Sequence, residues 1–470
     1  MRIELSEGTG RPSHPGLGRF AGILVVLSGL FLAGSRPAAA ERLATTNSLI
    51  TQPLSRSEAI NVALRQNPGI LRAQKDVAAA QGVVIQTRAI AIPKIQVTGD
   101  YTAVQPSSVD KPPAGVPRFS FGTDQSWITK LRLVQSIYEG GRMVSAFRVA
   151  RLTKAQSVLN YQTTVANTVL DVQVAYDDVL LAEQQITVQD ASVELLGREL
   201  ADTTRRYEAG TVPRFNVLRA EVELANARPK LIRARNSFRI AKNNLANLLG
   251  FNVARETVED IPLQLTDKLV AEPYEIKLPQ AIGLALERRT ELGALRKAQA
   301  LRKEDVVNAR AGYKPSLQAF AGYSAHSSLF DPDISHELHG WLTGVDLSWD
   351  IFDGLRTRGK VQETTALYER AGVELDDRSR TIELEVRTAF SNFIESQELL
   401  ESQKKVVEEA EEALRLARVR NEAGTGTQLD VLGAQTALTE ARTTQIQALH
   451  DYSATRARLE RAVGAILPSN

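Results

Sequence analysis

The chain has 470 residues, of which 43% are hydrophobic and 24% are charged, a composition typical of a folded protein. Its 57 basic and 55 acidic residues leave a net charge of only +2, which excludes a strongly basic surface of the kind that binds nucleic acid. There are no cysteines, so we expect neither a disulfide framework nor a lipidated N-terminal cysteine.

Residues 1–40 have the pattern of a secretory signal peptide. Arg11 and Arg19 precede an apolar run over residues 20–33, and three alanines, residues 38–40, lie directly before Glu41. The run is too short for a membrane anchor, since a spanning helix needs about 20 residues. No later segment offers 18 uninterrupted apolar residues. A mature chain that crosses a membrane must therefore do so as a closed β-barrel.

The rest of the chain is predicted to be a duplicated unit. The segment SEAINVALRQNPGILRAQ resembles PQAIGLALERRTELGALR, and their alignment sets Ala59 on Ala281, a shift of 222 residues. Farther along, Trp127 matches Trp341 with a shift of 214, so one loop of the first repeat is expected to be eight residues longer. We expect a first repeat over residues 41–250, a linker over 251–277, a second repeat over 278–465 and a tail over 466–470.

Each repeat is predicted to start with a helix. In the first repeat a capping box, Ser55-x-x-Glu58, begins this helix, and in the second repeat Pro279 lies in its first turn. Both helices are expected to continue to a proline, Pro93 or Pro315, where an alternating segment begins.

Four alternating segments are predicted to form strands. The fourth is the clearest, since Trp341, Val345 and Trp349 share one face. A half-buried sheet of a soluble protein would give the same alternation, but aromatic residues near the segment ends favour contact with lipid. We expect Trp127, Trp341 and Trp349 to face lipid. Four strands cannot close around a lumen, so protomers must pool their strands, and three protomers would supply twelve.

A longer helix follows the strands in each repeat. Residues 142–196 contain neither proline nor glycine, and a helix of that length measures about 80 Å. Its apolar residues recur every three or four positions, as in a coiled coil whose remaining surface is wet. Tight turns are expected at Gly210 and Gly424, where glycine adopts a left-handed conformation without steric cost, followed by shorter returning helices.

No catalytic residues are predicted, so an enzyme is not expected, and neither is a cofactor or a metal site. His336-Glu337-Leu338-His339 is one residue short of the i, i+4 histidine spacing of a zinc protease, and we expect it in an extracellular loop. Gly424-x-Gly426 lacks the third glycine and the preceding strand of a dinucleotide-binding loop.

The two turn sequences resemble a known family. RYEAGT and FNVLRAE lie between Arg206 and Glu221, and RNEAGTGTQLDVLGAQ lies between Arg420 and Gln435. With the duplication, they resemble TolC-like outer-membrane efflux proteins over nearly all of residues 54–465. The resemblance implies an α+β membrane protein, a homotrimer with a 12-stranded β-barrel that continues as an α-helical barrel through the periplasm. It further implies the exit duct of a tripartite efflux or type I secretion system for small molecules or proteins.

The resemblance also implies partners and a constricted entrance. A periplasmic adaptor and an inner-membrane pump or ABC transporter are expected to dock at the turns, and outer-membrane lipid surrounds the barrel. The entrance carboxylate of the family falls on Asp430, which is explained equally well as a charge favoured by the helix dipole. A second carboxylate of the family falls on Gly433. The residues of the family's ionic latch fall on Asn421, Gly426 and Asn216, so that latch is largely missing.

Apolar groups at the exposed tips of the helical hairpins are predicted to be the docking surface for the adaptor. The residues expected at these tips are Gly210, Thr211, Leu218, Gly424, Thr425 and Leu432. The alternative interpretation is that the chain is itself a periplasmic coiled-coil adaptor. An adaptor would carry one hairpin inserted in β-rich modules, whereas the strands predicted in this chain lie inside a duplicated helical unit.

We predict cleavage after Ala40, because the three small residues there directly precede a charged mature start. N-terminal sequencing of the purified protein should begin at Glu41. Retention of the apolar run would contradict the prediction of secretion.

Overall fold

The structure is a computed structural model that describes residues 53–105, 123–251, 261–328 and 334–465. These residues belong to one compact unit, Gln52–Asn470. The predicted signal peptide, most of the loop predicted to be longer in the first repeat, the start of the linker and the tail lie outside the described residues.

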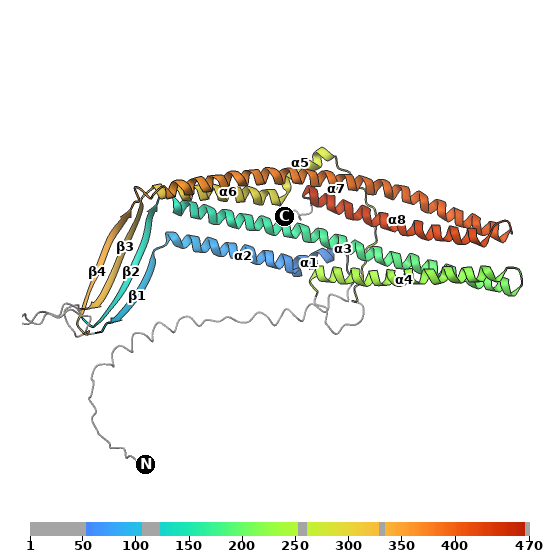
Figure 1. The fold of residues 1–470 in the computed structure, drawn as a ribbon, viewed down its shortest axis with the longest axis horizontal. Helices are drawn as coiled ribbons and strands as arrows, with labels where there is room; N and C mark the ends of the chain where they lie inside the picture. Colours follow the sequence, from blue (N-terminus) through green and yellow to red (C-terminus); the bar gives the residue numbers. More distant parts are fainter. Residues whose placement is uncertain (1–52, 106–122, 252–260, 329–333, 466–470) are drawn as a thin grey trace, which may run out of the picture. The chain divides into compact units, whose positions relative to one another are not determined.

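The helices occur in pairs of equal length, one member from each repeat (Figure 1). The pairs are α1 (Arg56–Gln66) and α5 (Leu278–Arg288) with 11 residues, α2 (Pro68–Arg88) and α6 (Thr290–Arg310) with 21, α3 (Arg142–Glu208) and α7 (Arg356–Glu422) with 67, and α4 (Arg214–Leu249) and α8 (Gln428–Val463) with 36. Two short 3₁₀ helices, η1 (Ala89–Ala91) and η3 (Ala311–Tyr313), follow α2 and α6. Equal lengths in all pairs are what a duplicated sequence predicts.

The long helices end at the turns predicted at Gly210 and Gly424. α3 continues through Gly197 to Glu208 and, at 1.5 Å per residue, measures about 100 Å. A single glycine costs a helix only about 1 kcal/mol, and packing against α4 on one side offsets this cost. α3 and α4 lie side by side, as do α7 and α8 (Figure 1).

The first helix of each repeat was predicted to be continuous, but it is broken in two. The capping box at Ser55 is present and starts α1. Pro68 then disfavours the helical conformation at Asn67, whose ψ is 124°, and α1 ends. Asn67 begins α2, since its side chain accepts hydrogen bonds from the N–H groups of Gly69 and Ile70 at 2.8 and 3.2 Å. In the second repeat Arg289 breaks the helix with a ψ of 120° and no proline.

The four strands form one antiparallel sheet in chain order, with β2 and β3 joining the repeats (Figure 1). They are β1 (Lys94–Ala103), β2 (Gln125–Glu139), β3 (Ser316–Ser327) and β4 (Glu337–Ser348). Tyr101 pairs with Trp127 and Tyr323 pairs with Trp341, so each hairpin has the same aromatic pair. β1 and β4 are edge strands, to which no other described strand is paired.

One face of the sheet is apolar and exposed. Its most exposed residues include Ile95, Val97, Trp341, Val345 and Leu347, and Trp341 is 78% exposed. A contiguous apolar surface of this kind is rare on a protein in water and marks an interaction with lipid or with another protein. None of the helices in the described residues is long and apolar enough to cross a membrane.

Two of the three tryptophans that were expected to face lipid have surroundings that the sequence did not predict. Trp349 lies one residue beyond the end of β4, where its Nε1–H donates to the Tyr313 carbonyl at 3.2 Å. Trp127 is in β2 but is half-buried, and its Nε1–H donates to the Ile334 carbonyl at 2.9 Å. Indole N–H groups near strand ends reach backbone carbonyls because an apolar surface offers no other acceptor.

The helical hairpin of the first repeat, formed by α3 and α4, meets that of the second repeat, formed by α7 and α8, where α3 packs on α8. Tyr176 of α3 is fully buried, and its hydroxyl donates to the Leu54 carbonyl at 2.9 Å. In the second repeat, Phe393 of α7 packs against Tyr452 of α8 with ring centroids 5.3 Å apart. These clusters lie close to the helix breaks, so the packing is densest where α1 and α5 cover the long helices.

We expect Gly250→Ala to lower the free energy of unfolding by about 1–3 kcal/mol. Gly250 ends α4 with a φ of +78°, and a Cβ there would lie 2.6 Å from the Gln66 carbonyl oxygen. As a matched control, Gly433→Ala meets no atom within 4 Å and should stabilise α8 by about 0.5–1 kcal/mol. Thermal unfolding followed by circular dichroism in detergent measures both. Equal midpoints for Gly250→Ala and the wild type would contradict the expectation.

Candidate functional site

The two turns at the hairpin tips share one backbone geometry. Gly210 and Gly424 have φ values of +73° and +72°, so the predicted left-handed conformation is confirmed. Thr211 and Thr425 follow them, and each donates its N–H and its hydroxyl to the carbonyl five residues earlier. This is the Schellman arrangement, in which a left-handed residue lets the chain return to the last helical turn. The threonine hydroxyls are therefore engaged within the turn.

The returning helices start differently in the two repeats. The Asp430 carboxylate accepts hydrogen bonds from the N–H and the hydroxyl of Thr427 at 2.9 and 2.8 Å, which forms a capping box at α8. These hydrogen bonds lower the pKa of Asp430. α4 instead starts after Pro213, which has no capping side chain. Asp430 thus stabilises a helix start, and its role at a constriction stays a prediction.

The predicted apolar tips are only partly exposed. Phe215, Leu218 and Leu429 are exposed, and Leu218 is 48% exposed. Leu432, its counterpart in the second repeat, is only 3% exposed because it packs against Leu196 of α3 and Ala227 of α4. The expectation that Leu432 presents an apolar group at the tip is therefore wrong.

A hydrogen-bonded contact that the sequence did not predict joins the two tips. The Gln428 side-chain amide of α8 donates to the Thr203 hydroxyl of α3 at 2.5 Å and to the Glu199 carboxylate at 3.5 Å. Thr203 is buried, so this hydrogen bond is shielded from water. Together with the burial of Leu432, it holds the end of α8 against α3. Residues 225 positions apart carry no local signal that they meet.

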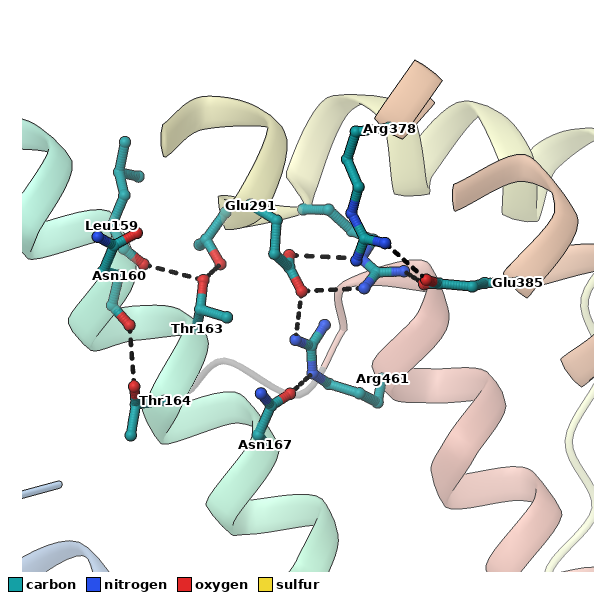
Figure 2. Close-up of polar contacts among 11 residues, drawn as sticks. Leu159, Asn160, Thr163, Thr164, Asn167, Glu291, Arg378, Glu385 and Arg461 are labelled. Atoms are coloured by element: carbon teal, nitrogen blue, oxygen red, sulfur yellow. Dashed lines mark hydrogen bonds and ion pairs between the residues drawn. The ribbon is translucent and has the colours of Figure 1, made fainter. Parts of the chain in front are cut away.

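A charged network surrounds the break between α5 and α6. Glu291 accepts from Arg289 at 2.9 Å and from Arg461 of α8 at 2.6 Å (Figure 2). Arg461 also donates to Asn167 of α3 at 2.9 Å, so the network joins the repeats. Burial alone would raise the pKa of Glu291, but the hydrogen bonds from the two arginines outweigh it and lower the pKa to about 2. Arg289 further pairs with Glu385 of α7.

A second polar cluster lies on the same contact between α3 and α8. Asp177 is almost fully buried, pairs with Arg56 of α1 and accepts from the Ser453 hydroxyl at 2.6 Å. His450 lies beside it, with Nε2 at 2.8 Å from Asp178 and Nδ1 at 3.0 Å from Asp451. Burial opposes the charged imidazole, but the hydrogen bonds to both aspartates outweigh this effect and raise the pKa of His450.

The structure offers no metal centre within the residues that it describes, where no group of three or more His, Asp or Glu side chains could hold an ion. Glu337 and His339 were expected in a loop, but they lie in β4, where His339 pairs with Ala325 of β3. The expectation was wrong because the strand begins four residues before Trp341.

Comparison with known proteins places these features in a family. A family model described as outer membrane efflux protein matches residues 59–251 and 281–465. Outer membrane protein TolC of Vibrio cholerae is 25% identical, over 87% of this chain and 90% of that protein. Alkaline protease secretion protein AprF of Pseudomonas aeruginosa is 24% identical, over 73% and 70%. Cobalt-zinc-cadmium resistance protein CzcC of Cupriavidus metallidurans is 22% identical, over 88% and 90%.

Solved structures share the fold. The outer-membrane channel OprN matches with a TM-score of 0.73 at 20% identity, over 88% of this chain and 91% of that chain. VceC of Vibrio cholerae matches with a TM-score of 0.71 at 20% identity, over 87% and 96%.

The class defined by this fold and these matches is that of the outer-membrane export channels. The chain belongs to the outer membrane efflux protein family. The predicted family, export function and outer-membrane location with extension into the periplasm are confirmed.

We expect His450→Asn to destabilise the protein more at about pH 5.5 than at about pH 9. The pKa of His450 is raised on folding, so its contribution is fully present below the unfolded pKa and is lost as the pH rises through the folded pKa. At low pH the lost charge-assisted hydrogen bonds should cost about 1.5–3 kcal/mol. Thermal unfolding of both proteins across this pH range measures the difference. A difference that does not change with pH would show that His450 acts only through packing.

Proposed function

We propose that the chain is one protomer of a homotrimeric exit duct. In this proposal three sheets close a 12-stranded β-barrel in the outer membrane, and the long helices form a tunnel wall in the periplasm. The observation that carries the proposal is the sheet, which has an exposed apolar face and two edge strands that no other described strand covers. Open edges cannot remain in lipid, so β1 of one copy has to pair with β4 of the next.

The helices support the same assembly. Beyond its tip, α4 exposes an apolar stripe with intervals of seven and three, formed by Val222, Pro229 and Ile232. Such spacing is typical of a coiled-coil seam. The α8 counterpart of Ile232 is buried, since Ile446 is 9% exposed whereas Ile232 is 65% exposed. α8 packs on α3 of the same chain, and the stripe on α4 requires a second copy.

The position of the duct in an export pathway follows from the relatives. AprF is named for the secretion of a protease and CzcC for resistance to metal ions. We therefore propose that the chain works in a tripartite efflux or type I secretion system, with a periplasmic adaptor and an inner-membrane pump or ABC transporter as partners. Phe215, Leu218 and Leu429, which are exposed at the tips, suit docking to the adaptor. An adaptor identity for this chain is disfavoured by the apolar sheet.

The assembly is tested by native mass measurement of the full chain in detergent and by conductance in planar bilayers. We expect three copies per particle and ion conductance through each particle. A stable folded monomer without conductance would contradict the proposal.

The two turns should respond differently to substitution. Gly424→Val forces a β-branched residue to positive φ, which costs about 1–3 kcal/mol and should deform one tip without preventing barrel assembly. We expect weaker cross-linking to the adaptor in cells. Asp430→Ala should leave docking unchanged and alter cation block of the channel, because it removes a carboxylate from the proposed entrance. Unchanged cross-linking in the first variant, or unchanged conductance and block in the second, would remove the corresponding role.

A further inference from the structure

The contact between α3 and α8 has a counterpart that one chain cannot make. In the repeat alignment α3 corresponds to α7 and α8 to α4, with a shift of 214 residues. Ser192 and Thr439, whose hydroxyl oxygens are 3.3 Å apart, then correspond to Val406 and Ala225. Because the paired helices have equal lengths, the same shift of 214 residues applies along the whole contact.

A second pair of contacting residues fixes the alignment of α4 with α7 farther along the helices. His450 and Asp178, which are in contact, correspond to Asn236 and Asn392. Between the two transferred pairs, Ile232 of α4 comes level with Leu399 of α7. Both are exposed apolar residues, and Ile232 belongs to the apolar stripe of α4. The matching face of α7 also borders an apolar groove of about 360 Å³, lined by Leu384, Thr388 and Asn392 among others.

Opposite charges lie at the same level of the two helices. On α4 the stretch 228–239 has five basic residues and no acidic one, and we call it the basic band: Arg228, Lys230, Arg233, Arg235 and Arg239. On α7 the stretch 388–403 has three acidic residues and no basic one, and we call it the acidic band: Glu395, Glu398 and Glu401. Both bands are exposed in the single chain.

Several of these charges are unpaired within the part of the chain that the structure describes. Arg228, Lys230 and Arg233 form no ion pair with any described residue, and neither do Glu395 and Glu398. The equivalent contact inside the chain places His450 of α8, whose pKa is raised, beside the Asp178 carboxylate of α3. The internal seam therefore also sets a group that can be protonated on the returning helix against a carboxylate of the long helix.

We propose that the basic band of α4 binds the acidic band of α7 in a second copy of this chain, so that the seam between copies is electrostatic at this level. This inference rests on the proposed trimer, and it identifies the charges that determine how α4 and α7 of neighbouring copies align. Charges that flank an apolar seam determine which helices pair and in which orientation. Salt screens such pairs, since the Debye length falls from about 10 Å at 0.1 M to about 3 Å at 1 M.

Charge reversal and its compensation test the seam. The first variant is Arg228→Glu with Arg233→Glu, and we expect it to lower the trimer fraction about tenfold or more in native mass measurement of the full chain. Adding Glu398→Lys and Glu401→Lys, which the transferred register sets nearest to Arg233 and Arg228, should restore trimers to within about twofold of the wild type, because opposite charges again face each other. Arg228→Lys with Arg233→Lys preserves charge at the same positions and should assemble normally. Circular dichroism verifies the helical fold of each variant.

The outcomes separate this inference from the proposed duct. A wild-type chain that forms no trimer contradicts the duct. Wild-type trimers that are unaffected by charge reversal, or whose dissociation temperature is the same at about 0.02 M and about 1 M salt, overturn the electrostatic seam and leave the duct intact. Reversal without rescue by the compensating pair also overturns it.

Discussion

The packing of α3 against α8 is the interaction on which the rest of the structure depends. The repeats also meet where α3 packs on α6 and where β2 pairs with β3, but the contact of α3 with α8 joins the helical hairpin of α3 and α4 to that of α7 and α8. Its polar groups recur along its length, from Asn167 and Arg461 through Asp178 and His450 to Thr203 and Gln428. A buried apolar seam alone would allow helices to slide by a heptad, whereas buried hydrogen bonds tolerate one register only.

Much of the fold was predictable because its signals are local. The capping box at Ser55, the glycines at 210 and 424 and the alternation in the strands each act within a few residues. The duplication added information that a single repeat lacks, because agreement between two copies separates a structural requirement from chance. Asp430 could be placed at a helix start because a carboxylate in the first turn is favoured by the helix dipole.

The features that were missed depend on tertiary contacts. The helix break at Arg289 has no proline, and it is stabilised by Glu385 of α7 and, through Glu291, by Arg461 of α8, which approach it only in the fold. Leu432 and Leu218 occupy equivalent positions in the two repeats. Leu432 is covered by residues of α3 and α4, whereas Leu218 is exposed. A pattern within one helix identifies an apolar face, but it does not tell whether that face is covered by the same chain or by another copy.

The equal lengths of the helix pairs restrict how such a duct changes in evolution. A residue inserted into α3 alone would rotate everything beyond it by about 100° relative to α8 and would break the polar contacts of the seam. An insertion of a whole heptad keeps the same side of a helix packed against its neighbour. It must occur in α3, α4, α7 and α8 together so that both tips stay at the same level. Each such step lengthens the helices by about 10 Å. The reach of the protein across the periplasm is therefore adjustable only in discrete increments, and relatives should differ in helical length by multiples of seven residues.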